Sequence, residues 1–576
     1  MFKTLRTFYH FIYRKRLVYT LVIVTIVIAN VLYNITPYFL KLFVEAIPSL
    51  DYQQLIQILV VYTAIGILGH IFGIGGEWIS DVILLEASRD AREEIFRHVQ
   101  SLDFTFHSGK STGGLISAFK RGDGAFFDLY HTIHFNILNI FITTIVMIFF
   151  FSRINLLIAG TMLLSLVIIL IVINYLIKYN IKRRNIFNDE EDNVSGIIAD
   201  NMLNYETVKL FAKENWEEKR LSGAFVIWLK TLWGYANSFR LIDVVLAIIT
   251  TASTFITFFI ALYLTVNGKL TAGDFVLVVS FVGIFIPKVW NLVYGIRGIA
   301  KNYADIEKYF GFLDNKVEVL DPEKPVKIDH VFGEINFDKV HFTYNGRSKN
   351  AINGINLKVE QGQSVALVGR SGSGKTTLTK LLMRFYDIES GEITIDGINI
   401  KDFTKSTLRS FVGVVPQEPI LFNNTIAYNI GYGKDKPKLS EIKAASKLAN
   451  IDEFIESLKE KYNTEVGERG VKLSGGQKQR LAIARMILSD PDIVVFDEAT
   501  SHLDSESEKL IQDAFWKARA GKTTIIIAHR LSTIMRADKI VVMEHGKIKE
   551  AGTHESLLED KNSLYSHFWN LQIKLD

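Results

Sequence analysis

The 576-residue sequence contains no cysteine, which excludes disulfide bonds, thiolate metal sites and cysteine nucleophiles. It also lacks a strong excess of one charge, because 65 basic and 61 acidic residues leave a formal net charge of +4. This balance excludes a strongly basic nucleic-acid-binding protein, although a local basic patch is compatible with it. We therefore expect no nucleic-acid partner.

Charged residues are absent from five long stretches of the chain, and a sixth is interrupted only by Lys288. Each stretch exceeds the ~20 apolar residues that are needed to cross a hydrocarbon layer of ~30 Å. Together they predict an integral, multi-pass membrane protein with six helical spans, in contact with membrane lipid. The stretches are residues 17–40, 52–76, 129–152, 154–177, 244–268 and 275–296.

The charges between the spans predict the orientation. The connections over residues 77–128 and 178–243 are rich in Arg and Lys, whereas residues 43–54 carry acids and no base. By the positive-inside rule, both long connections and both termini are cytoplasmic, in a bacterial inner or plasma membrane. The basic residues 1–16 then form a cytoplasmic segment; an organelle presequence remains an alternative, and a cleaved signal peptide is disfavoured. Helical periodicity continues beyond the apolar stretches, so spans two to five extend past the bilayer.

The composition changes after the last span. We expect a transmembrane domain over residues 17–310, a linker over 311–334 and a soluble α/β domain over 335–576. The fold class is therefore an α-helical membrane domain fused to an α/β nucleotide-binding domain. In the soluble domain, helical stretches alternate with short β-rich runs at residues 364–368, 392–395, 493–496, 523–527 and 539–543.

A complete phosphate-binding motif, G-x-x-x-x-G-K-[ST], follows the β-rich run 364–368 and opens a helix. Its glycines allow backbone N–H groups to converge on phosphate oxygens, Lys375 reaches the β- and γ-phosphates, and Thr376 ligates Mg²⁺. The motif predicts ATP and Mg²⁺ as cofactors. The ATP-binding residues predicted here are Gly369, Arg370, Ser371, Gly372, Ser373, Gly374, Lys375, Thr376 and Thr377.

The apolar run 493–496 ends in two acids, Asp497 and Glu498. An acid at the end of a strand beside a phosphate loop can hold the metal through water, and this is Asp497. The next acid, Glu498, can orient and deprotonate the attacking water. Alone, such a run often marks only a strand that meets a polar loop. The phosphate motif favours the catalytic interpretation.

Residues 473–480, Leu-Ser-Gly-Gly-Gln-Lys-Gln-Arg, resemble the signature motif of the ATP-binding cassette (ABC) transporters. Ser474, Gly475, Gly476 and Gln477 begin a helix and so form a second anion-binding helix end. In that family, ATP lies between the phosphate loop of one cassette and the signature of a second. Six spans ahead of one cassette resemble the half-transporter layout of ABC exporters. The resemblance implies a second half-transporter as partner, with a homodimer as the first choice and a heterodimer as the alternative.

The resemblance assigns further residues of the cassette. Tyr344 resembles the aromatic residue that stacks on adenine, and Gln417 resembles the glutamine that senses Mg²⁺ and the γ-phosphate. Asp504, in residues 501–504, belongs to a segment that resembles the D-loop, and His529 resembles the switch histidine, which is counted with Glu498 as catalytic. His502 departs from the small residue that is usual in the D-loop. The implied function is ATP-driven export by alternating access; an ATP-gated channel or regulator on the same scaffold is the alternative.

The loop segments 102–107 and 203–209 resemble those of mitochondrial-type exporters of glutathione-linked or heavy-metal substrates. We expect residues 203–209 to form a cytoplasmic turn that contacts the cassette, or else an ordinary helix face. Arg297 lies where that subfamily has a substrate-contacting arginine, but Asp243 replaces its amide pair, so the substrate is not carried over. Asp243, Lys288 and Arg297 are candidate cavity residues for an anionic or zwitterionic substrate. Alternatively, Lys288 lies near the cytoplasmic end of a span.

Overall fold

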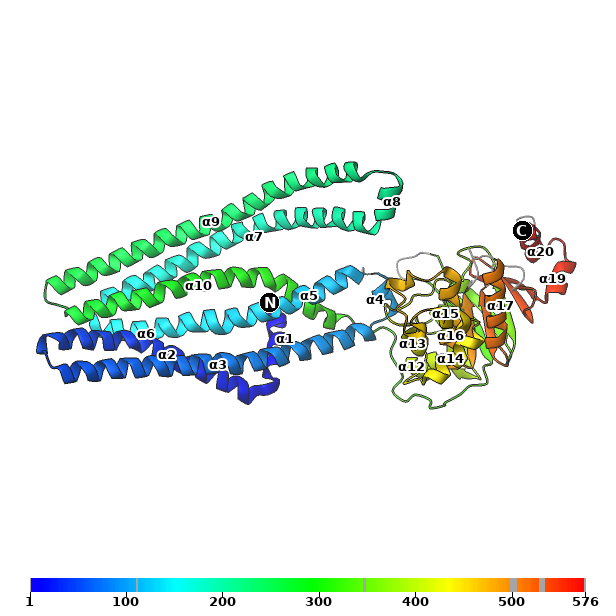
Figure 1. Ribbon diagram of the computed structural model, residues 1–576, viewed down its shortest axis with the longest axis horizontal. Coiled ribbons are helices and arrows are strands. Elements are labelled where there is room, and N and C mark those ends of the chain that lie inside the picture. The colour runs from blue at the N-terminus through cyan, green and yellow to red at the C-terminus, as the bar shows by residue number, and fades with distance from the viewer. Residues whose placement is uncertain (1, 110–111, 345–348, 498–504, 528–533, 574–576) are drawn as a thin grey trace. The chain divides into compact units, whose positions relative to one another are not determined.

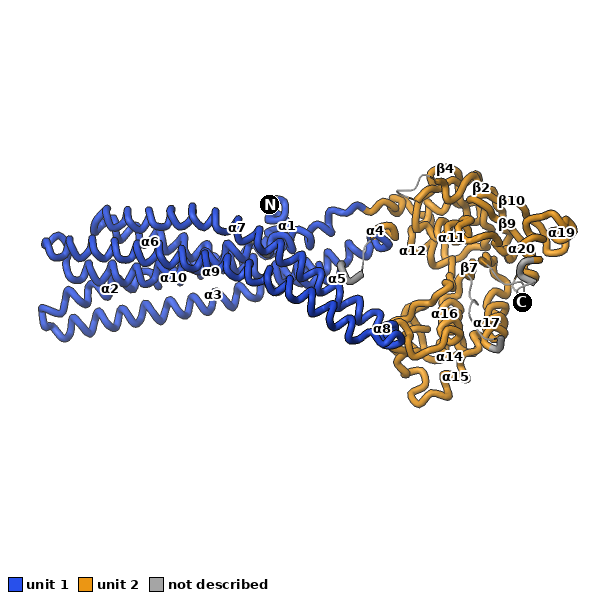
Figure 2. Tube along the Cα trace, turned by 90° about the horizontal axis from the view of Figure 1, so that it is seen from above, with its two compact units in different colours: residues 1–102, 107–316 blue, residues 103–106, 317–576 orange. Residues whose placement is uncertain are grey.

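A computed structural model describes residues 2–109, 112–344, 349–497, 505–527 and 534–573 of the chain. These residues form two compact units, which Figure 2 shows in different colours. Unit 1 comprises residues 1–102 and 107–316, and unit 2 comprises residues 103–106 and 317–576. The short segment 103–106 thus belongs to unit 2 although it lies between two helices of unit 1.

Unit 1 consists of long helices and short turns among its described residues (Figure 1). Six helical stretches are long and apolar enough to cross a membrane, which confirms the predicted number of spans. Short 3₁₀ turns lie at Tyr13–Lys15, Ile47–Ser49 and Phe312–Asp314. The helices are α1 (Phe2–Ile12), α2 (Arg16–Ala46), α3 (Tyr52–Ser101), α4 (Phe104–Ser108, shared with unit 2), α5 (Thr112–His131), α6 (Leu138–Ile154), α7 (Leu156–Leu203), α8 (Tyr205–Leu210), α9 (Glu214–Val266) and α10 (Ala272–Gly311).

Caps at the helix ends explain the short turns between spans. Asp51 accepts hydrogen bonds from the amides of Gln53 and Gln54 at the start of α3, and Thr271 forms a capping box with Asp274 at the start of α10. Such side chains satisfy N–H groups that have no partner within the helix. The α2–α3 and α7–α9 pairs lie side by side (Figures 1 and 2). As predicted, α3, α7 and α9 continue well beyond their apolar stretches.

A π-helix at Thr132–Ile137, which no sequence pattern indicated, joins α5 to α6. It packs against α10 at Gly295, where an added Cβ would lie 2.9 Å from Asn136 Nδ2 and 2.9 Å from Thr132 Cγ2. The close approach depends on the absence of a side chain at Gly295. A π-helix adds one residue to a helical turn, which hardly changes the spacing of apolar residues along the sequence. It is therefore recognised from the structure alone.

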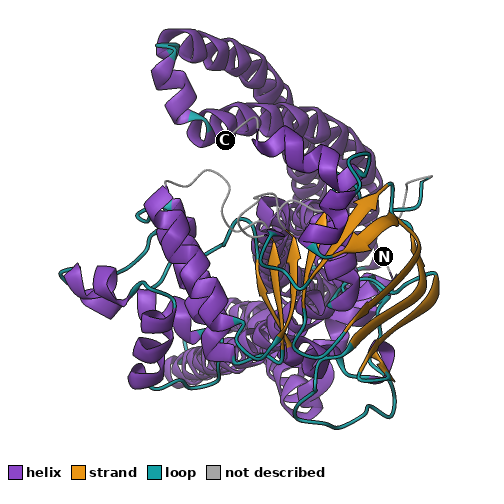
Figure 3. Ribbon diagram, turned by 90° about the vertical axis from the view of Figure 1, so that its right-hand side faces the viewer, coloured by secondary structure: helices purple, strands orange, loops and turns teal. Residues whose placement is uncertain are grey.

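Unit 2 contains all the described strands, which form two sheets (Figure 3). The six-stranded sheet has the order β10-β9-β3-β8-β7-β6, with every pair parallel except β10–β9. The four-stranded sheet, of order β2-β1-β4-β5, is antiparallel. The strands are β1 (Ile335–Phe342), β2 (Ile352–Val359), β3 (Ser364–Val368), β4 (Ser390–Ile395), β5 (Ile398–Asn399), β6 (Val412–Val415), β7 (Ile493–Asp497), β8 (Thr523–Ile527), β9 (Lys539–Glu544) and β10 (Lys547–Gly552).

The predicted β-rich runs correspond to β3, β4, β7, β8 and β9, which confirms the α/β fold class. The parallel strands β3 and β8 are buried at every residue, so their sequences read as continuous apolar or small runs. The strands β1 and β2 were not predicted, because polar residues interrupt them and half their positions are not fully buried. Tertiary pairing overrides weak local propensity in such strands.

Helices cover the two sheets around two hydrophobic cores. One core holds α11, with Leu378, Leu381 and Leu382, against both sheets, and the other holds α14, α16 and α17. Because the central strands are parallel, the loops after β3, β6 and β7 meet at one edge of the sheet. The helices are α11 (Lys375–Leu382), α12 (Lys405–Phe411), α13 (Ile426–Gly431), α14 (Leu439–Leu448), α15 (Asp452–Ser457), α16 (Gly475–Ser489), α17 (Ser505–Ala518), α19 (His554–Glu559) and α20 (Leu564–Ile573).

Candidate nucleotide site

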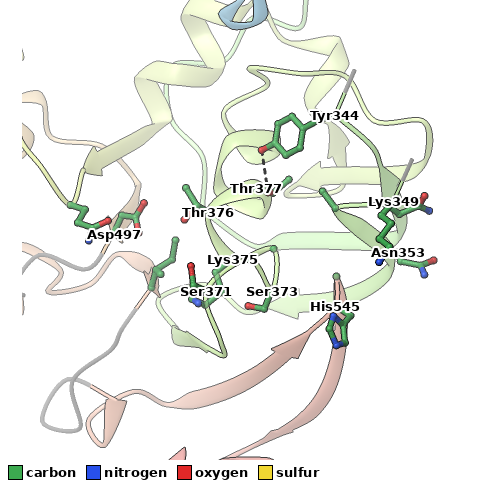
Figure 4. Close-up of a pocket in the computed structure, with 17 residues that line it drawn as sticks. Tyr344, Lys349, Asn353, Ser371, Ser373, Lys375, Thr376, Thr377, Asp497 and His545 are labelled. Atoms are coloured by element: carbon green, nitrogen blue, oxygen red, sulfur yellow. Dashed lines mark hydrogen bonds between the residues drawn. The ribbon is translucent and has the colours of Figure 1, made fainter. Parts of the chain in front are cut away.

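A cavity of about 1230 Å³ opens at this edge of the sheet (Figure 4). The predicted residues Tyr344, Ser371–Thr377, Gln417 and Asp497 all line it. The structure therefore brings together residues that are separated by more than a hundred positions in the sequence. Several further lining residues were not predicted, since no local motif marks them: Lys349, Asn350, Ala351, Asn353, Ile527, His545 and Gly546.

The phosphate loop connects β3 to α11, and its backbone shape requires glycine. Gly369, Gly372 and Gly374 have φ values of 151°, 79° and 109°. An added Cβ on Gly369 would lie 2.2 Å from the carbonyl oxygen of Met543, and one on Gly374 would lie 2.9 Å from that of Ala351. The loop therefore keeps the tight form that points amide N–H groups at a bound anion.

Two side chains of the loop fit a phosphate ligand. Lys375 is 6% exposed, and its ammonium donates to the carbonyls of Gly369 at 2.7 Å and Arg370 at 3.2 Å. Ser373 Oγ is buried and has no hydrogen-bond partner among the residues that the structure describes. A buried hydroxyl without a partner costs about 1–3 kcal/mol, which an oxygen of a bound phosphate would recover.

Hydrogen bonds at Ser364, the first residue of β3, hold the strand that precedes the phosphate loop. The amide and hydroxyl of Ser364 donate to Asp538 Oδ2 at 2.8 and 2.6 Å. Partial burial opposes ionisation of Asp538, but these hydrogen bonds and the nearby Arg519 hold the pKa of its carboxyl below the usual value. Asp538 therefore accepts these bonds as a carboxylate at neutral pH and anchors β3.

Tyr344 lies just beyond β1, and its ring stands at one side of the cavity in Figure 4. Its hydroxyl lies 3.1 Å from Thr377 Oγ1, and its ring packs edge-on against Phe342 and Tyr386. The ring is thus fixed in orientation beside the helix that begins at the phosphate loop. An aromatic face held in this way can stack on a nucleobase.

Asp497 is the last residue of β7, and Gln417 follows the neighbouring strand β6. In the β6–β7 pair Val415 is opposite Phe496, so Asp497 and Gln417 lie at the same edge of the sheet. Thr376 lines the same cavity. A carboxylate, an amide oxygen and a hydroxyl are oxygen ligands of the kind that Mg²⁺ prefers. Among the residues that the structure describes, no group of three or more His, Asp or Glu side chains could hold a metal.

Gln479 positions Gln417, a role that no sequence motif indicated. Its side-chain amide donates to the carbonyl oxygen of Gln417 at 2.5 Å and to that of Pro416 at 3.4 Å. Gln479 is buried and belongs to α16, the helix that begins with the signature-like residues. The contact therefore connects α16 to the side of the cavity where Gln417 lies.

The signature-like residues form a capped helix end. Ser474 Oγ accepts a hydrogen bond from the amide of Gln477 at 3.3 Å, and Gln477 Oε1 accepts one from the amide of Ser474 at 2.9 Å. In the described part of this chain, Ser474, Gly475, Gly476 and Gln477 do not line the nucleotide cavity. Glu498, His502, Asp504 and His529 lie outside the described residues, so their predicted roles remain predictions.

The segment Asp103–Phe106 packs within unit 2. The Asp103 carboxylate accepts hydrogen bonds from the amides of Glu318 and Val319. The Phe104 ring stacks on Phe385 with centroids 5.2 Å apart, and Lys380 Nζ lies 5.3 Å from the centre of the same ring. Since Lys380 belongs to α11, this segment contacts the helix that carries Lys375 and Thr376 at its start.

In unit 1, two of the three candidate cavity residues lie in one cluster. Tyr294 donates its hydroxyl to Asp243 Oδ1 at 3.1 Å, and the Arg297 guanidinium lies 4.2 Å from the centre of the Phe239 ring and 5.1 Å from that of Tyr294. Phe239 and Asp243 belong to α9, and Tyr294 and Arg297 belong to α10. The cluster presents an acid, a base and two aromatic rings.

Lys288 lies apart from this cluster. Its ammonium donates to Thr143 Oγ1 at 2.6 Å, Asn139 Oδ1 at 3.2 Å and Asn30 Oδ1 at 3.4 Å. Asn30 and Thr143 lie near the middle of the charge-free stretches 17–40 and 129–152. This placement favours a lysine deep in the span over one near its cytoplasmic end.

Comparison with known families matches both units. A model of the ABC transporter transmembrane region matches residues 19–289, and an ABC transporter model matches residues 352–501. A solved structure of a bacterial Atm1-family ABC exporter with ATP bound is similar over 97% of this chain and 98% of that one, with a TM-score of 0.86 and 33% sequence identity.

Several proteins have similar sequences. ABC transporter B family member 6 of Dictyostelium discoideum is 37% identical over 508 residues, which cover 84% of this chain and 74% of that protein. Heavy metal tolerance factor 1 of Caenorhabditis elegans is 37% identical over 495 residues, covering 84% and 61%. An ATP-binding/permease protein of Bacillus subtilis is 36% identical over 508 residues, covering 86% and 85%. The chain spans only 58% of the human ATP-binding cassette sub-family B member 6.

Proposed function

The chain belongs to the ATP-binding cassette (ABC) transporter family, and from this membership we propose that it is a half-transporter that couples ATP hydrolysis to export across a membrane. The observation that carries the proposal is the cavity where the phosphate loop, Tyr344, Gln417 and Asp497 converge, in a chain with six membrane-crossing helices. These helices distinguish it from a soluble cassette ATPase. No feature of the described residues favours the alternative, an ATP-gated channel or regulator.

In this proposal, the residues of the cavity have different roles in binding and hydrolysing ATP. ATP bound with Mg²⁺ would supply a γ-phosphoryl group, and transfer of this group to water would release the free energy that drives export. Lys375 is placed to exchange its two carbonyl acceptors for phosphate oxygens, and Ser373 adds a buried donor. Thr376, Gln417 and, through water, Asp497 would hold Mg²⁺. Glu498 directly follows the last residue of β7 and would accept the proton of the attacking water.

A second chain completes the site in this proposal. The phosphate loop and the signature helix end of one chain do not share the cavity, so Ser474–Gln477 of a partner would close it. The helix end offers free N–H groups to the γ-phosphate. Because no motif in the sequence is degenerate, two copies of this chain would form two working sites; Asp504 and His529 join each site from the sequence.

In this proposal, closure of the cassettes is transmitted to the membrane domain through contacts such as those of Asp103–Phe106. Phe104 contacts both α11, through Lys380, and Phe385. Movement of α11 with the nucleotide would therefore displace the segment that joins α3 to α5. This arrangement supports alternating access, in which ATP favours one orientation of the spans and its hydrolysis restores the other.

The cluster of Asp243, Tyr294, Arg297 and Phe239 is the substrate contact site that we propose, for a small molecule with both an acid and a base or for an organic anion. Its charged groups are only partly buried and are held by aromatic rings rather than by a mutual ion pair. They could therefore exchange partners with a ligand. Lys288, deeper in the bundle, would add positive charge. The loop charges support an orientation with both termini in the cytoplasm, and we propose a bacterial inner or plasma membrane as the location.

The catalytic proposal is tested with Glu498→Gln and Lys375→Ala in the full chain reconstituted in lipid. Glu498→Gln retains size and hydrogen bonding but accepts no proton, so ATP should bind normally while hydrolysis falls by ~10² to 10⁴. Lys375→Ala should instead lose ATP binding. Glu460→Gln, an exposed acid that does not line the cavity, is the control. Near-normal hydrolysis by Glu498→Gln would place the base elsewhere.

The substrate proposal is tested by the stimulation of ATP hydrolysis in a screen of organic anions, zwitterions, peptides and lipids. Arg297→Ala, Asp243→Asn and Lys288→Ala should abolish stimulation by the active compound while basal hydrolysis persists. Arg240→Gln is the control, because Arg240 lies on α9 but is exposed and stacks on Trp233 instead. Unchanged stimulation in all three variants would remove these residues from recognition.

A further inference from the structure

The first helix, α1, runs across the long helices of unit 1 rather than along them (Figure 1). Phe8, Phe11 and Ile12 on one face are at most 2% exposed. The Phe8 ring packs against Phe126, and the Phe11 ring packs against Phe310. The opposite face carries exposed basic residues, Lys3, Arg6 and His10. The protein itself therefore covers the apolar face of α1, and the basic face points away from the bundle.

Ion pairs fix the turn between α1 and α2 to α3. Arg14 pairs with Asp90 at 3.4 Å and Glu94 at 2.5 Å, and Lys15 pairs with Glu86. The next residues face outward: Leu17 is 87% exposed and Leu21 is 49% exposed. The lipid-facing apolar surface of α2 thus begins directly after Arg16, which places Arg16 at the level of the lipid head groups.

At this level lies a cavity of about 640 Å³, lined by Arg6, Tyr9, His10, Tyr13, Arg14 and Arg16. Arg14 already has two carboxylate partners, but in the described part of the chain no carboxylate lies within ion-pair distance of Arg6 or Arg16. The rings of Tyr9 and Tyr13 stack with centroids 5.3 Å apart and form an aromatic wall. The cavity therefore combines unpaired guanidinium groups with an apolar side.

We propose that this cavity binds the phosphate group of an anionic phospholipid, with Arg6 and Arg16 as its guanidinium ligands. Guanidinium groups match phosphate oxygens in shape and charge. The Tyr9 and Tyr13 rings would lie beside the glycerol, and the acyl chains would follow the exposed Leu17 and Leu21 along α2. This continuity with lipid-facing surface favours a lipid over a soluble phosphate. The proposal does not depend on the transport function.

The test is native mass spectrometry of the full chain in detergent, after incubation with phosphatidylglycerol or phosphatidylcholine. The wild type should retain phosphatidylglycerol preferentially. Each basic residue near an anionic lipid contributes about 1 kcal/mol, so Arg6→Gln/Arg16→Gln should weaken this retention about thirtyfold. Lys3→Gln/Arg89→Gln removes the same charge outside the cavity and should retain the lipid.

Glycerol 3-phosphate serves as a soluble competitor in the same experiment, and Arg6→Lys/Arg16→Lys tests the role of charge alone. Competition by millimolar glycerol 3-phosphate would identify a soluble anion and overturn the lipid assignment. Equal retention of both lipids, or unchanged retention in the double glutamine variant, would overturn the site. A folded wild-type-like elution profile of each variant is required for these comparisons. Partial retention in the lysine variant would support guanidinium geometry as the determinant.

Discussion

Tyr344 shows how one side chain acquires a role from its neighbours. By sequence it is one of 22 tyrosines. In the structure, its hydroxyl meets Thr377 and its ring contacts Phe342 and Tyr386, so the face is held beside the phosphate loop. An orientation fixed before binding lowers the entropy lost when a base stacks on the ring.

We expect Tyr344→Ala to weaken ATP binding markedly, because stacking of a base on an aromatic ring contributes about 1–3 kcal/mol. Tyr344→Phe keeps the ring and loses only the hydroxyl contact with Thr377. It should therefore bind ATP nearly as well as the wild type. Equilibrium titration with a fluorescent ATP analogue measures both. Equal affinity of the alanine variant and the wild type would contradict the stacking role.

In unit 1, contacts between neighbouring helices determine which side chain a position can hold. Gly122 of α5 lies against α10, where an added Cβ would lie 2.4 Å from the Cβ of Tyr309. Tyr309 is only 1% exposed, so a shift of its side chain would disturb the residues packed around it. Two turns of helix that approach so closely leave no room for even one methyl group.

Gly122→Ala should therefore destabilise the protein by about 1–3 kcal/mol, the usual cost of overpacking. Gly124→Ala is the matched control on the same helix, because an added Cβ there meets no atom of the described residues within 4 Å. It should be neutral or stabilising, since alanine favours a helix over glycine by about 1 kcal/mol. The apparent melting temperature in detergent, followed by size-exclusion chromatography, measures both. A Gly122→Ala variant as stable as Gly124→Ala would show that the helices can separate here.

At the scale of the whole molecule, the absence of cysteine becomes an experimental advantage. Any introduced cysteine is unique, so the sidedness of each loop can be measured without altering other residues. Lys269 lies in the short turn between α9 and α10, and Lys209 lies in α8, within the long polar connection between α7 and α9. Both side chains are exposed.

We expect a membrane-impermeant maleimide to label Lys269→Cys in intact cells and Lys209→Cys only after the membrane is opened. The reason is the excess of basic residues in the long connections, which remain on the cytoplasmic side. A cysteine at Glu45 should behave as Lys269→Cys does, since it lies at the same end of the bundle and Glu45 contacts Thr271. Labelling of Lys209→Cys in intact cells would reverse the proposed orientation.

The amino-acid sequence was sufficient to predict the six spans and the α/β class of the soluble unit, and its motifs supply the residues of the proposed nucleotide site. These features depend on local signals: hydrophobic runs as long as a bilayer is thick, and motifs whose residues are contiguous. The contacts between residues that are distant in sequence became known from the three-dimensional fold. The antiparallel sheet, the π-helix against Gly295, the contact of Gln479 with Gln417 and the arginine cavity beside α1 arise from packing and pairing. Because such contacts have no fixed spacing along the chain, no sequence pattern predicts them.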